Sequence, residues 1–264
     1  MTYSGAGMLC GMTHPGALPP HRSTGRVRRL VWVGVLLVSL GAYAGCGAAP
    51  QTAPPSGVDG LVIPTPSPDP SDFVTEVDNP WLPLAPGNSW TYHLDGLPPD
   101  RTQSVEVLGD TRVVAGVEAT QVRTRTLSRA GRVVGEQLRW FAQDWAGNVW
   151  ALGELGVWEA GVGQARAGLA MPATPRLGDG FVLAETEAGQ QRVRIIETGV
   201  AASVQAGEFT ELLHTLETTA AQTQTDVFHA RGVGEVLRLG PDQQRIELVE
   251  YVVDGTTSDS APDQ

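Results

Sequence analysis

The sequence predicts an all-β protein, or a β-dominated one with one or two short helices. The expected architecture is a single curved antiparallel sheet that forms a half-barrel or a barrel. About eleven segments of the 264-residue chain favour strands, several of them alternating apolar and polar residues at the strand period of two. Turns rich in glycine separate these segments at short intervals. No long segment repeats its apolar residues at the spacing of an amphipathic helix.

The N-terminal part of the chain has the layout of an export signal. Arg22, Arg26, Arg28 and Arg29 precede an uncharged, mostly apolar run at residues 30–44. A spanning helix needs about 20 apolar residues, so this run is short for a permanent span and typical of a signal peptide. The alternatives are an uncleaved, tilted anchor and a twin-arginine signal. Translation starting at Met8 or Met12, instead of Met1, is equally compatible.

The end of this run, Ala-Tyr-Ala-Gly-Cys at residues 42–46, resembles the lipobox of bacterial lipoproteins. Tyr43 departs from the leucine that is usual in the motif. The resemblance implies that residues 1–45 are a lipoprotein signal peptide cut before Cys46. It also implies that the thiol of Cys46 carries a diacylglycerol. The expected location is therefore outside the cytoplasm, anchored to a bacterial membrane.

Composition limits the partners and the redox chemistry. The only cysteines are Cys10 and Cys46, and Cys10 precedes the expected cut, so the processed chain has no internal disulfide. All basic residues are arginine, and after the cut 14 of them face 29 acidic residues, a net charge of −15. Such a negative field repels nucleic acid, which we therefore exclude as a partner.

The processed chain divides into three expected parts. Residues 46–72 combine the lipidated cysteine with a tether whose seven prolines make it an extended spacer. Residues 73–254 form one β domain, and residues 255–264 form a polar, acidic, disordered tail. The domain opens with three prolines between residues 80 and 86, which exclude a helix and a central strand. We expect this opening stretch to cross one end of the core and to bury Trp81 and Leu84.

The expected strands follow in order. They cover residues 90–94, 105–107, 113–114, 117–127, 133–143, 181–187, 191–198, 209–217, 226–230, 234–239 and 245–253. Gly116 is expected to turn the chain between two of them. A hairpin turn is expected at residues 144–148, where Gly147 and Asn148 suit positive backbone angles. A short helix is expected near residues 160–170.

Several short motifs resemble a group of uncharacterised bacterial envelope proteins. They are PLAPGNSWTY at residues 83–92, AQDWAGNVW at residues 142–150, and GVG at residues 232–234. Arg231 stands where the group's pattern usually carries proline. The resemblance implies a secreted or lipid-anchored single domain on a curved antiparallel sheet, similar to lipoprotein-carrier folds. It implies neither an activity nor site residues.

The sequence shows no cofactor motif and no typical metal motif. His93, His214 and His229 are the only histidines after the expected cut, and none lies at ligand spacing with another histidine or with cysteine. Asp144 and Asn148 could belong to a calcium-binding turn, but the spacing of oxygen ligands in an EF-hand is missing. No Gly-x-Ser-x-Gly nucleophile motif occurs.

Carboxylates near tryptophans leave one enzymatic hypothesis open. Asp144, Glu154 and Glu159 lie in a stretch that holds four of the seven tryptophans. A glycosidase needs two carboxyl groups at a fixed separation, with room for a sugar ring between them. These three residues are therefore weak candidates for the acid–base pair of a hydrolase.

A binding function is the main expectation. A curved sheet lined by aromatic side chains would suit a hydrophobic small molecule, although the same side chains could simply fill the core. The candidate pocket residues are Trp90, Trp140, Trp150, Phe181 and Phe209. The alternatives are an envelope protein as the bound partner and a structural role in envelope assembly. We expect a membrane-anchored, non-catalytic binding domain.

Overall fold

A computed structural model describes residues 69–96 and 101–257. Cys46, the expected signal peptide and most of the expected tether lie outside these residues. The described chain is almost entirely β-sheet, which confirms the predicted fold class. Its only helical element is the single-turn 3-10 helix η1 (Pro70–Asp72). No helix among the described residues is long and apolar enough to cross a membrane.

The strands form one antiparallel sheet. They are β1 (Phe73–Val74), β2 (Ser89–Asp95), β3 (Arg101–Val114), β4 (Val117–Leu127), β5 (Val133–Asp144), β6 (Val149–Glu154), β7 (Trp158–Glu159), β8 (Arg166–Met171), β9 (Gly180–Thr186), β10 (Gly189–Val204), β11 (Gly207–Thr218), β12 (Gln224–Ala230), β13 (Gly234–Leu239), β14 (Arg245–Val253) and β15 (Thr256–Thr257).

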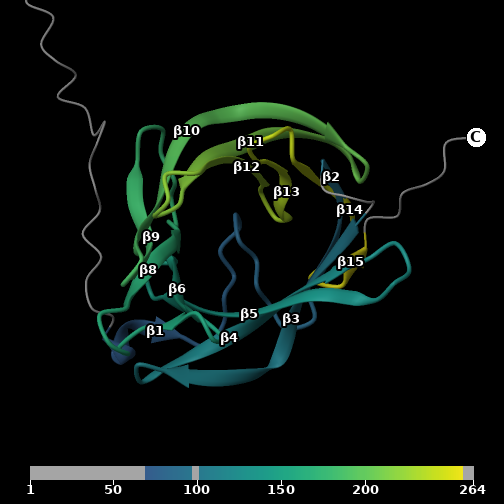
Figure 1. The fold of residues 1–264 in the computed structure, drawn as a ribbon. Coiled ribbons are helices and arrows are strands. Elements are labelled where there is room, and N and C mark those ends of the chain that lie inside the picture. Colours follow the sequence, from purple (N-terminus) through teal and green to yellow (C-terminus); the bar gives the residue numbers. More distant parts are fainter. Residues whose placement is uncertain (1–68, 97–100, 258–264) are drawn as a thin grey trace, which may run out of the picture. The chain divides into compact units, whose positions relative to one another are not determined.

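Pairing of β5 with β6 closes the sheet into a ring. The strand order runs β5-β4-β3-β2-β14-β13-β12-β11-β10-β9-β8-β6, and β6 then pairs back onto β5, which makes a 12-strand antiparallel barrel. Figure 1 shows this ring along its axis. Closure gives each barrel strand two neighbours, so no long strand edge is left without hydrogen-bond partners.

Local sequence explains the hairpins. Val114 pairs with Val117, so β3 and β4 are joined by the two residues Ala115 and Gly116. Their φ angles are 50° and 82°, the two positive values of the tight turn whose twist matches that of the strands. The expected turn at Gly116 is thus confirmed.

A proline-rich segment, residues 75–88, crosses one end of the barrel, as expected. We call it the plug segment. Its backbone binds the turns around that end: the amide of Gly232 donates to the carbonyl of Pro80 at 2.6 Å, and the Asn79 side chain donates to the carbonyls of Gly147 and Pro172. Figure 1 shows the segment inside the ring of strands. Leu84 is buried, whereas Trp81 is half-buried.

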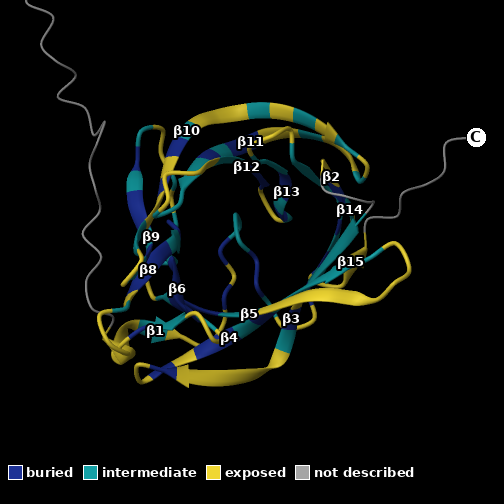
Figure 2. Ribbon diagram, in the orientation of Figure 1, coloured by how far each residue is buried: buried dark blue, intermediate teal, exposed yellow. Residues whose placement is uncertain are grey.

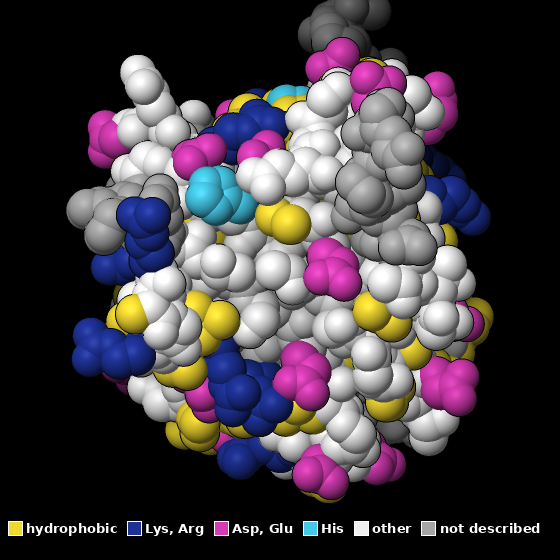
Figure 3. Space-filling model, turned by 90° about the vertical axis from the view of Figure 1, so that its right-hand side faces the viewer, with side chains coloured by type: hydrophobic (Ala, Val, Ile, Leu, Met, Phe, Trp, Pro, Cys, Tyr) yellow, Lys and Arg dark blue, Asp and Glu magenta, His cyan; other side chains and the backbone are white. Residues whose placement is uncertain are grey.

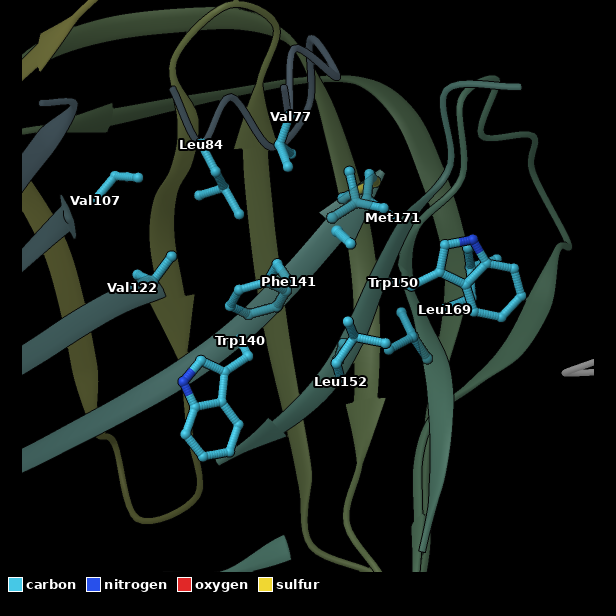
Figure 4. Packing of buried hydrophobic residues seen from close by; sticks show 14 of the residues in the cluster. Val77, Leu84, Val107, Val122, Trp140, Phe141, Trp150, Leu152, Leu169 and Met171 are labelled. Carbon is cyan, nitrogen blue, oxygen red and sulfur yellow. The ribbon is translucent and has the colours of Figure 1, made fainter. Parts of the chain in front are cut away.

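The core lies on the inner face of the barrel and beneath this plug segment. Along β2 every second side chain is buried, namely Trp90, Tyr92 and Leu94. Figure 2 shows exposed residues along the barrel strand β10. Figure 4 shows Leu84 on the same side of β5 as Phe141. Consecutive residues of a strand face opposite sides, so Trp140 lies on the outer side of β5. There the Arg112 guanidinium covers its ring at 4.4 Å.

The helix expected near residues 160–170 is wrong. Residues 161–165 form turns, with positive φ at Gly161 and Gly163, and β8 begins at Arg166. Pairing with β6 and β9 holds β8 extended, and glycine is needed at position 168 because a Cβ there would collide with the backbone carbonyl of Leu183. At the other end of the chain, β15 pairs with β14, so the strands continue past residue 254.

Candidate ligand-binding cavity

The barrel contains a cavity of about 410 Å³ that is partly open to solvent. Small-molecule sites typically measure roughly 300–1,000 Å³, so the volume suits one small ligand. The part nearest the plug segment is apolar. It is formed by side chains of that segment and of β2 to β5: Leu82, Leu84, Trp90, Val105, Val122 and Phe141.

The cavity becomes polar further from the plug segment. Gln103 lies two residues from Val105 on β3, and Thr124 lies two residues from Val122 on β4. Gln137 lies four residues from Phe141 on β5, and Gln191 contributes from β10. Trp158, Leu183 and Ile246 add apolar surface to the wall. The site can therefore surround a molecule that has both an apolar part and a polar part.

Five charged side chains reach the cavity. They are Arg139, Glu154, Glu217, Glu235 and Arg238. At neutral pH three carboxylates thus face two guanidinium groups. Charges of both signs inside a barrel are costly unless they are paired, so their partners decide what the site can bind.

Arg238 is fully paired. Its Nε and Nη2 donate to the two carboxylate oxygens of Glu235 at 2.9 and 2.8 Å, and its Nη1 donates to Glu217 at 2.7 Å. Burial alone would lower the pKa of Arg238, but the two carboxylates raise it well above its ordinary value. Burial likewise raises the pKa of Glu217, yet Arg238 outweighs this effect and the net pKa is lowered.

Arg139 differs sharply from Arg238. It is half-buried, and no carboxylate of the described chain lies within 4.0 Å of its guanidinium. The group lies over the Phe141 ring, 4.9 Å from its centroid. Burial lowers the pKa of Arg139, and the more distant Glu217 and Glu154 offset this only in part. Arg139 is therefore a cavity cation without a close counter-ion.

His229 lies beside the charged network. It is opposite Glu235 in the register of β12 and β13, is 7% exposed, and its Nδ1 has no hydrogen-bond partner. Burial lowers the pKa of His229, with Glu235 and Glu217 opposing the shift. The residue is therefore held as neutral imidazole near neutral pH.

The structure brings only one of the predicted pocket aromatics to the cavity. Trp90 lines it and donates through Nε1 to the carbonyl of Val233 at 2.7 Å. Trp140, Trp150 and Phe181 are buried in the hydrophobic core and are not among the residues that line the cavity. Phe209 is half-buried and packs against that core.

The three candidate carboxylates lie in separate environments. Asp144 stabilises the β5–β6 turn, where it accepts hydrogen bonds from the Asn148 amide and from Trp150 Nε1, both at 2.9 Å. Glu159 pairs with Arg112 at 2.8 Å. Glu154 alone lines the cavity. The chain therefore does not join these residues into the facing pair that a glycosidase needs.

The other two histidines are partly buried and contact carboxylates away from the cavity lining. His93 Nε2 lies 2.9 Å from Asp95, and His214 Nε2 lies 2.8 Å from Asp226. Residues 69–96 and 101–257 contain no group of three His, Cys, Asp or Glu side chains that could hold a metal ion.

Figure 3 shows that hydrophobic side chains on one face form small groups among charged ones.

Of the five charged cavity residues, sequence reasoning named only Glu154 and missed Arg139, Glu217, Glu235 and Arg238. A signal was present in β5, where Gln137, Arg139 and Phe141 share one face of a strand. Polar residues on an inward face indicate a lumen rather than a solid core. Reading that signal requires knowing which face points inward, and alternation alone does not decide this when both faces carry charges.

Comparisons with known proteins place the chain in no family. No family model matches it, and no curated protein matches it. Among solved structures, it is similar to a candidate lipoprotein from Parabacteroides distasonis, with 11% sequence identity and a TM-score of 0.38. The match covers 65% of this chain and 97% of the other. These values are too low to support an inference about fold or function.

Proposed function

We propose that this protein is an extracytoplasmic lipoprotein whose barrel binds a small hydrophobic or amphipathic molecule. The cavity of about 410 Å³, with its apolar end at the plug segment, is the observation that carries the proposal. A barrel that served only as a scaffold would be more stable with a closely packed interior. A space of this size lacks those packing contacts, which favours a binding role.

The anchor is proposed from the sequence. The basic segment, the apolar run and the small residues before Cys46 together indicate processing and lipidation at that cysteine. An envelope protein partner remains an alternative to the small ligand. The hydrolase hypothesis requires two facing carboxylates, and Asp144, Glu154 and Glu159 lie in separate environments.

Native mass spectrometry tests the ligand. Every strand of the barrel lies between residues 73 and 257, so the chain starting at residue 47 contains the complete folded unit. This chain, purified from its own host, should carry a bound small molecule that denaturation releases. Thr124→Phe should abolish the adduct by filling the cavity, whereas Thr198→Phe, on an exposed position of β10, should retain it. A wild-type chain free of any adduct under native conditions would contradict the proposal.

Fractionation tests the anchor separately. The native product should lie in the membrane fraction with an intact mass that shows diacylglycerol on Cys46. Cys46→Ser should release it from that fraction while leaving the barrel folded. An unprocessed N-terminus, or an unmodified thiol at position 46, would contradict lipid anchoring and leave the cavity proposal untouched.

A further inference from the structure

We propose that the ligand is an amphiphile with one carboxylate head, which the Arg139 guanidinium binds inside the barrel while an apolar tail lies against Leu82, Leu84, Trp90 and Phe141. This inference rests on the proposed ligand-binding function and specifies the chemistry of the site. No such role follows from the sequence motifs.

The contrast between the two cavity arginines carries the inference. Arg238 already donates to two carboxylates, so its hydrogen-bonding groups are occupied. Arg139 shares the same cavity, yet among the described residues its close side-chain partner is the Phe141 ring and not a carboxylate. A planar guanidinium presents several donors in a geometry that matches a carboxylate. A ligand carboxylate would therefore be the close counter-ion that no described residue provides for Arg139.

The charge of the cavity limits the head to a single negative charge. Glu154 lies opposite Arg139 in the register of β5 and β6, and Glu217 also contributes a negative potential at Arg139. Three carboxylates and two guanidinium groups already give the cavity a net negative charge, so Arg139 can hold at most one ligand carboxylate against them. A second one would face these carboxylates without a further cation, because Arg238 is paired.

The geometry also orients the tail. Arg139 lies over Phe141, which is two residues closer to the plug segment on the same face of β5. Leu82 and Leu84 of that segment line the same apolar end. A water molecule occupies about 30 Å³, so about 410 Å³ holds about 14 groups of that size. Dodecanoate, with as many non-hydrogen atoms, is a suitable probe.

Calorimetric titration with three probes of equal chain length tests the inference. Dodecanoate, dodecanol and dodecylammonium are titrated below their micelle-forming concentrations into the delipidated chain that starts at residue 47. The wild type should bind dodecanoate about tenfold or more tightly than dodecanol, the factor expected from charge-assisted hydrogen bonds. Arg139→Met should remove that preference. Arg125→Met, whose partner Glu136 lies on the outer face, should keep it.

Each remaining outcome overturns something specific. Equal binding of dodecanoate and dodecanol to the wild type, or tighter binding of dodecylammonium, overturns the carboxylate inference and leaves ligand binding standing. A preference that survives in Arg139→Met overturns the role of Arg139. Binding of none of the probes overturns the inference and counts against the proposed function. The wild-type comparison needs no variant, so it holds even if Arg139→Met fails to fold.

Discussion

Removing Arg238 should destabilise the barrel strongly at neutral pH. Arg238→Met leaves Glu217 and Glu235 inside the cavity without their cation. The three side chains are only 23–27% exposed in their ion pairs. Loss of one partner of a buried pair costs about 3–5 kcal/mol. Because these groups retain some exposure, we expect about 3 kcal/mol, or a fall in Tm of roughly 6–12 °C for a domain of this size.

The pH dependence distinguishes this mechanism from simple loss of packing. In the wild type the pKa of Glu217 is lowered by Arg238, so its contribution to stability is present above the ordinary glutamate pKa and is lost as the pH falls. In Arg238→Met the largest effect that lowers the pKa of Glu217 is gone, so burial, opposed only by the weaker effects of Arg139 and His229, raises that pKa above its wild-type value. The variant should therefore lose less stability, relative to the wild type, at pH 4 than at pH 7.

Equilibrium unfolding in urea at both pH values measures the effect. Arg125→Met is the matched control, since its ion pair with Glu136 is exposed on the outside and should contribute less than about 1 kcal/mol. Adding Glu217→Gln to Arg238→Met should recover part of the loss at pH 7. A loss below about 1 kcal/mol, or one of equal size at pH 4 and pH 7, would refute the reasoning.

Three further substitutions test other parts of the structure. His229→Leu should flatten the decline in unfolding free energy as the pH falls below about 6.5, because the lowered pKa of His229 makes stability fall in that range; an unchanged pH profile of urea midpoints would contradict this. Gly168→Ala should cost about 2 kcal/mol or more by collision with Leu183, whereas Gly109→Ala, with free space around it, should change the thermal midpoint little. Asp144→Ala should cost about 1–3 kcal/mol through its lost turn hydrogen bonds while leaving probe binding unchanged, and impaired binding would place Asp144 closer to the site than the structure does.

Strands could be predicted from the sequence where apolar and polar residues alternate regularly. Trp90, Tyr92 and Leu94 alternate with polar residues, and β2 follows that pattern. Expected strands at residues 234–239 and 245–253 coincide with β13 and β14. The period of two is a local property, so it can be read without knowledge of partners.

The strand β8 shows where local reading failed. Its residues Arg-Ala-Gly-Leu-Ala-Met include two alanines that favour a helix. The extended backbone is instead stabilised by pairing with β6 and β9. Both partners are neighbouring segments of the chain, but the hydrogen bonds between the strands are tertiary contacts, and these override a weak local propensity.

The aromatic residues show that local sequence patterns also fail to identify the residues of the site. Trp140 and Phe141 are neighbours on β5, and the sequence analysis predicted Trp140, not Phe141, as part of a pocket wall. Phe141 lines the cavity, whereas Trp140 is covered on the outer side by Arg112. A shift of one residue exchanges the inner and outer faces of a strand, so residue type alone cannot separate the two.

The sequence by itself determined that this chain forms an antiparallel, disulfide-free β domain whose proline-rich opening crosses one end, because these features depend on local patterns and composition. Only the tertiary structure decided that β14 pairs with β2 to close the ring, and that inside it Arg238 is paired with two carboxylates while Arg139 has no close counter-ion among the described residues. Closure and register depend on contacts between residues far apart in the chain. The same contacts leave Arg139 beside the Phe141 ring with no carboxylate of the described chain close to it.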